Sequence, residues 1–66
     1  MITEIGIGAG DIWHYLDQHG ESSLSQMVRN IDKSRDLLLM SLGWLSREGH
    51  VVVKEQGSDF LAYLRK

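Results

Sequence analysis

The sequence contains no cysteine, no proline and no apolar run that approaches the ~20 residues of a membrane-spanning helix. Without cysteine there are no disulfides and no thiolate zinc sites, and three histidines alone do not make a structural zinc site. Residues 1–20 lack the basic start of a signal peptide. We therefore expect a cytoplasmic protein with no metal, no cofactor and no membrane partner.

Positive charge is also scarce, and it is unevenly distributed. The chain carries a net charge of −2. Residues 1–21 hold four acidic residues and no lysine or arginine, whereas residues 22–66 hold all seven basic residues against five acidic ones. Free-standing nucleic-acid-binding proteins usually carry a strong basic patch, so we expect weak non-specific binding to DNA.

The length bounds the architecture. Sixty-six residues leave room for one domain, residues 1–66, and exclude barrels and doubly wound sheets. A chain this short buries only about 60% of its unfolded surface, so it depends on tight helix packing or on a partner chain.

No group of residues has the pattern of an active site. Gly6, Gly8 and Gly10 are spaced G-x-G-x-G, and not G-x-G-x-x-G as in a dinucleotide-binding loop. His14 and His19 lie about 140° apart around a helix, so they do not share a face. No serine, histidine and aspartate form a recognisable catalytic motif, and a small core leaves no room for a substrate. We predict that the protein is not an enzyme.

Hydrophobic periodicity predicts three helices. The glycine-rich residues 1–10 are expected to be extended, and the first helix to run from about Asp11 to Gly20, which suits a left-handed cap. Ser23 and Gln26 have the spacing of a capping box and begin a short second helix.

The third helix is predicted over residues 33–48, with Asp32 or Ser34 as its N-cap and Gly49 after its end. Its apolar residues recur at i, i+4 and i+7, which is one helical face. We expect this face in the core, packed against the first two helices and a hairpin: Leu38, Leu42 and Leu45 against Ile12, Leu16, Met27 and Val28.

After Gly49 the apolar period changes from 3.6 to 2. Residues 51–54 and 60–64 are rich in β-branched, aromatic and other apolar side chains, so we expect two strands. The five residues between them, 55–59, contain Gly57 and predict the turn of a hairpin. The fold class is therefore α+β, with three helices and a two-stranded hairpin.

This order of elements resembles a winged helix-turn-helix, in which the hairpin is the wing. Counted from Ser34, apolar residues stand at +4 (Leu38), +8 (Leu42) and +11 (Leu45), and Gly49 stands at +15. This spacing resembles that of the recognition helix of winged-helix regulators. Ala9-Gly10 and the stretch Leu-Gly-Trp-Leu-Ser-Arg-Glu at residues 42–48 resemble a small free-standing bacterial winged-helix family without an assigned function. The resemblance implies a transcription-regulatory module that binds DNA as a homodimer or in a larger assembly.

The exposed face of the third helix is the part that would enter the DNA major groove. Here that face holds Asp36, Leu39, Met40 and Gly43, with one basic residue, Arg47, at its far end, whereas base-reading residues are usually polar or basic. The candidate DNA contacts are basic and hydroxyl side chains around the turn and on the wing: Arg29, Lys33, Ser34, Arg35 and Lys54.

The same face supports a second hypothesis, a protein-interaction or dimerisation module that has lost DNA binding. Gly43 in a helix costs about 1 kcal/mol relative to alanine, and such a glycine often allows another backbone to approach. We predict a homodimer with Leu39, Met40, Gly43 and Trp44 at the contact. The alternative for Trp44 is packing beneath the hairpin of its own chain.

Overall fold

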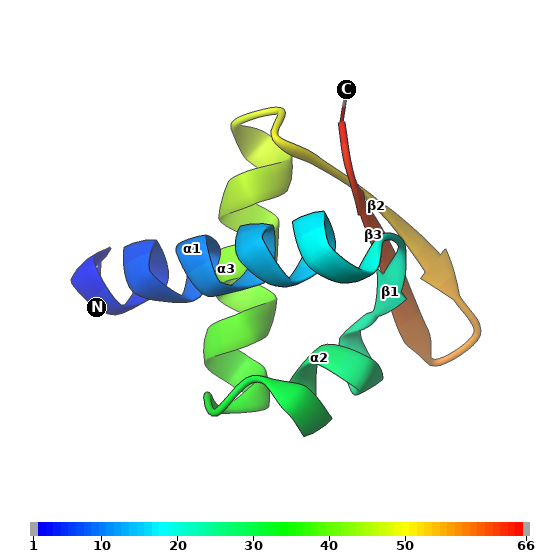
Figure 1. The fold of residues 1–66 in the computed structure, drawn as a ribbon, viewed down its shortest axis with the longest axis horizontal. Coiled ribbons are helices and arrows are strands. Elements are labelled where there is room, and N and C mark those ends of the chain that lie inside the picture. The colour runs from blue at the N-terminus through cyan, green and yellow to red at the C-terminus, as the bar shows by residue number, and fades with distance from the viewer. Residues whose placement is uncertain (1, 66) are drawn as a thin grey trace.

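The computed structural model describes residues 2–65. Along the chain, its elements are α1 (Ile2–His19), β1 (Ser22–Ser23), α2 (Leu24–Asn30), α3 (Arg35–Arg47), β2 (Val51–Gln56) and β3 (Asp59–Leu64). Figure 1 shows α1 crossing α3, α2 beside the N-terminal half of α3, and the strands to one side of the helices. The predicted α+β fold with three helices and a hairpin is confirmed.

A single hydrophobic core joins the helices to the sheet. The buried face of α3 consists of Leu38, Leu42 and Leu45, as predicted, and each is at most 3% exposed. Half-buried Val28 packs beside it. The other buried apolar residues come from α1, α2 and the strands: Ala9, Ile12, Leu16, Leu24, Met27, Val51 and Ala62.

The first helix is longer than predicted, because it begins at Ile2 and not near Asp11. Gly8 is buried, and a Cβ built there would collide with the side chain of Ser41 on α3. The buried Ser41 hydroxyl donates a hydrogen bond to the Ile5 carbonyl over 3.1 Å. This close contact outweighs the low helix propensity of glycine. The predicted extended lead is therefore wrong, except at residue 1, which lies outside the described residues.

The sheet has three antiparallel strands in the order β1-β3-β2, so a two-residue strand joins the predicted hairpin. β1 pairs with the middle of β3, where Ser22 lies opposite Ala62. Pairing of β2 with β3 continues to Gln56 and Asp59, so the turn has two residues and not the five predicted. Gly57, the first turn residue, has a φ of 63°, as a type II′ turn requires.

Local capping signals define the helix-turn-helix. Ser23 and Gln26 form the predicted capping box at the start of α2. Ser34 is the N-cap of α3, and its hydroxyl oxygen accepts a hydrogen bond from the Leu37 amide over 3.1 Å. Gly49 adopts a φ of 81°, and this left-handed residue lets the chain reverse from α3 into β2.

Candidate functional site

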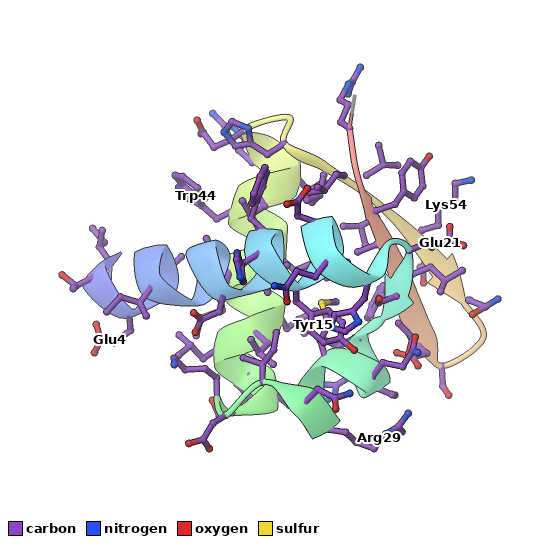
Figure 2. The ribbon with its side chains drawn as sticks, in the orientation of Figure 1. Glu4, Tyr15, Glu21, Arg29, Trp44 and Lys54 are labelled. Carbon is purple, nitrogen blue, oxygen red and sulfur yellow. The ribbon has the colours of Figure 1, made fainter. Side chains whose placement is uncertain are left out.

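The helix-turn-helix consists of α2, the turn at residues 31–34 and α3, and it exposes three of the predicted DNA contacts. Arg29 lies in the last turn of α2 and Arg35 is the first residue of α3. Figure 2 shows Arg29 extending from the outer edge of α2. Ser34 lies between them in the sequence and is exposed. Because its oxygen accepts the capping hydrogen bond of α3, its hydroxyl proton is available to an acceptor outside the chain.

Asp59 connects the wing to the helix-turn-helix. Its carboxylate accepts hydrogen bonds from the Phe60 amide (2.8 Å) and from the Ser25 amide in the first turn of α2 (3.3 Å). These bonds from Phe60 and Ser25, with the charge of Arg35, lower the pKa of Asp59. The wing turn and the starts of α2 and α3 therefore lie on one side of the molecule. No local sequence pattern marks this role, because Ser25 and Asp59 are 34 residues apart.

The two lysines among the predicted contacts interact within the chain. Lys33 Nζ lies 3.0 Å from Asp11 Oδ2, and the two side chains are 30% and 41% exposed. An ion pair this exposed is worth about 0.2–1 kcal/mol, so a phosphate can replace Asp11 as the partner of Lys33. Lys54 Nζ lies 5.5 Å from the centre of the Tyr63 ring on the hairpin. The structure thus leaves Arg29, Ser34 and Arg35 exposed and engages Lys33 and Lys54 in contacts within the chain.

The predicted dimer contact on α3 is largely exposed. Met40 is 41% and Trp44 is 46% exposed, and Gly43 also lies at the surface. Leu39 is half-buried and packs against the core of its own chain. The middle of this outward side of α3 is therefore apolar, with exposed Asp36 and Arg47 near its two ends, whereas a DNA-reading helix usually carries polar or basic side chains there.

Trp44 does not pack beneath the hairpin, so that alternative is wrong. It lines an apolar pocket of about 320 Å³ together with Ile2, Ile5 and Gly6 of α1. Figure 2 shows Trp44 beside the C-terminal half of α3 and on the side of α1 opposite Glu4. Sequence reasoning missed this pocket because it treated residues 1–10 as extended. The helical spacing of Ile2, Ile5 and Ala9 was the available signal.

A polar groove of about 630 Å³ lies between α1 and the α2–α3 turn. The Asp11–Lys33 ion pair lines it, and so does Tyr15, whose hydroxyl accepts a hydrogen bond from the Asn30 amide over 3.3 Å. Among residues 2–65, no group of three or more histidine, cysteine, aspartate or glutamate residues could hold a metal ion. Within the same residues, no helix has the length and apolar character that crossing a membrane requires.

The order of elements and the capped helix-turn-helix define a winged helix-turn-helix protein. The chain belongs to the winged helix-turn-helix domain family DUF2582, whose model matches residues 1–64. An uncharacterized protein of Methanocaldococcus jannaschii is 34% identical over 68 residues, which cover 98% of this chain and 96% of the relative. That relative is archaeal, so the resemblance is not confined to bacteria. No solved structure matches the chain.

Proposed function

We propose that this protein is a transcription-regulatory module that binds double-stranded DNA through the end of α2, the turn before α3 and the start of α3, with Lys54 on the wing. The observation that carries the proposal is the exposure of Arg29, Ser34 and Arg35 on the helix-turn-helix, with the wing held beside it by Asp59. A winged-helix fold is consistent with this function. As proposed, the module acts in the cytoplasm, is not an enzyme and uses no cofactor.

Phosphate contacts supply most of the affinity in this proposal. Arg29 and Arg35 bind phosphates directly, Ser34 donates its hydroxyl proton, and Lys33 exchanges Asp11 for a phosphate. Each neutralised phosphate contributes about −0.9 to the slope of log affinity against log salt, so three cations give a slope of about −2.7 per copy. Lys54 adds a further contact only where DNA reaches the side of the wing.

Sequence discrimination by such a surface is low. Leu39 is half-buried against the core of its own chain, and Asp36 can accept a hydrogen bond only from an exocyclic amino group such as cytosine N4. Three cations on a chain with a net charge of −2 also bind weakly as a single copy. The proposed module therefore acts as a homodimer or within a larger assembly, which multiplies the phosphate contacts.

The second candidate function is a protein-interaction module without DNA binding. The exposed side chains of Met40 and Trp44 favour it, since a DNA-reading helix usually exposes polar or basic groups there. The two functions differ in one measurable property, because only a phosphate-binding surface gives an affinity for duplex DNA that falls with salt.

The test is a fluorescence-anisotropy titration of a generic duplex at two salt concentrations. Arg35→Ala should weaken binding to all sequences alike and make the salt slope shallower by about 0.9. Arg65→Ala removes the same charge beyond the far end of β3 and is the matched control, which should retain the wild-type slope. If wild-type protein does not bind the duplex at low salt, the DNA-binding proposal is rejected and the interaction module is the candidate that remains. Equal losses for both variants would place the DNA surface elsewhere.

A further inference from the structure

Four of the five large hydrophobic side chains that are exposed within residues 2–65 lie on one face: Ile2, Trp13, Met40 and Trp44. Met40 and Trp44 are one turn apart on α3, and Ile2 lines the same apolar pocket as Trp44. Trp13 falls about 20° from Ile2 around α1, so it lies on the same flank, whereas the fifth residue, Ile7, falls about 140° away. We call this surface the tryptophan face.

Glycines without a role inside the chain border the tryptophan face. Gly6 and Gly10 fall within about 80° of Ile2 around α1. A Cβ built at either position would meet no atom within 4 Å, in contrast to Gly8, where it would meet Ser41. A glycine within a helix costs about 1 kcal/mol relative to alanine. At Gly6 and Gly10, neither a close contact within the chain nor a positive φ requires a glycine. Such glycines allow another helix to approach closely.

The charges beside this face favour one kind of occupant. Asp17 falls about 60° from Ile2 around α1, on the flank of the tryptophan face, whereas Glu4 and Asp11 fall about 180–200° away, and the helix contains no lysine or arginine. α1 therefore supplies no cation beside the face to bind the phosphates of nucleic acids or of lipid headgroups. Arg47, three residues after Trp44, supplies a positive charge on the α3 side. In a dimer with two-fold symmetry, α3 of one copy would lie against α1 of the other. The positive charge of Arg47 on one copy would then lie near the negative charge of α1 on the other, at the rim of the contact.

The exposed apolar area is sufficient for a small symmetric interface. A half-exposed tryptophan has roughly 100 Å² left to bury, and Ile2 and Met40 add similar areas. The face thus offers roughly 400 Å² per copy, or about 800 Å² in a pair, which is two thirds of the ~1,200 Å² of a small specific interface. If polar atoms at the rim supply the remaining third, the interface has the apolar fraction of about 65% found in homodimer interfaces.

We infer that the tryptophan face is the contact between two copies of this chain in a symmetric dimer. Of the contact residues predicted from the sequence, Met40 and Trp44 lie in it, Gly43 lies at its edge, and Leu39 packs inside its own chain. Met40, the residue of the face nearest the start of α3, is five residues after Arg35, or about 7.5 Å along the helix, so the dimer leaves the first turn of α3 accessible. The inference does not depend on DNA binding.

Sedimentation equilibrium over a wide range of protein concentrations tests the dimer. Ile2→Glu and Trp44→Glu place a charge in the face, and each should weaken the dimer at least about 100-fold, because a central tryptophan or apolar anchor counts twice in a symmetric contact. Ile7→Glu is the matched control, since Ile7 is 54% exposed on another flank of the same helix. It should remain dimeric, and circular dichroism should show all three variants folded.

Three results would overturn the inference. They are a wild type that stays monomeric at the highest concentration, a dimer that survives both face variants, and a loss of dimer in Ile7→Glu equal to that in Trp44→Glu. A DNA titration of monomeric Trp44→Glu keeps the two proposals apart, because that variant retains Arg29 and Arg35. A wild-type dimer without affinity for DNA would reject the proposed function alone.

Discussion

Replacing Gly8 with alanine is expected to destabilise the protein, whereas the same change at Gly10 is expected to stabilise it. Both glycines are helical residues of α1 and lie two positions apart. A Cβ at Gly8 would collide with the buried side chain of Ser41, and a Cβ at Gly10 would enter open space. The two substitutions therefore share the gain in helix propensity and differ in the contact with α3.

The size of the effect follows from what Ser41 loses. The gain in helix propensity is about 1 kcal/mol at either position. At Gly8 the Ser41 hydroxyl must move, and it loses its 3.1 Å hydrogen bond to the Ile5 carbonyl. A buried hydroxyl without a partner costs about 1–3 kcal/mol, and added volume in a packed contact costs about 1–3 kcal/mol more. Gly8→Ala should thus lower the free energy of unfolding by roughly 1–5 kcal/mol, and Gly10→Ala should raise it by about 1 kcal/mol.

Urea and thermal unfolding, followed by circular dichroism at low protein concentration, would measure both changes. The double variant Gly8→Ala with Ser41→Ala should recover part of the loss, because the colliding hydroxyl is gone while the Ser41 Cβ, 3.3 Å from the added methyl, remains. If Gly8→Ala is as stable as Gly10→Ala, the N-terminal half of α1 does not pack against α3 in solution, and our account of this helix is refuted.

Two further predictions concern the core and the wing. Leu45→Ala should cost about 2–5 kcal/mol because Leu45 is 3% exposed, and a melting temperature shifted by only a degree or two would contradict its burial. The lowered pKa of Asp59 means that its charge stabilises the fold above its ordinary pKa of 3.8, and that this contribution is lost as the pH falls through the lower, folded-state pKa. Asp59→Asn should therefore lose less stability than the wild type between about pH 5 and pH 2, and parallel pH profiles would argue against the hydrogen bonds at this carboxylate.

The third helix was predictable because its determinants are local. Leu38, Leu42 and Leu45 repeat at the helical period, Ser34 caps the start, and Gly49 supplies the left-handed residue after the end. Each of these signals acts within a few residues along the chain, so a reading of the sequence detects it.

The features that the sequence did not reveal depend on contacts between distant residues. Gly8 is compatible with a helix only because Ser41 fits against it, and these residues are 33 positions apart. The strand at Ser22 contains two residues, too few for any period, and it exists because β3 pairs with it. The partner of Lys33 is likewise on another helix, at Asp11, and no local pattern marks that ion pair.

The strand order has a consequence for synthesis of the protein. β3 is the last of the six elements in chain order, yet it is the middle strand of the sheet. Until β3 leaves the ribosome, β1 and β2 have no strand to pair with, and the core lacks the fully buried Ala62. The helices can pack against one another earlier, but the sheet closes only after translation has passed residue 64. Premature termination before Asp59 would therefore leave two unpaired strand segments beside an open core, which are the features that promote aggregation.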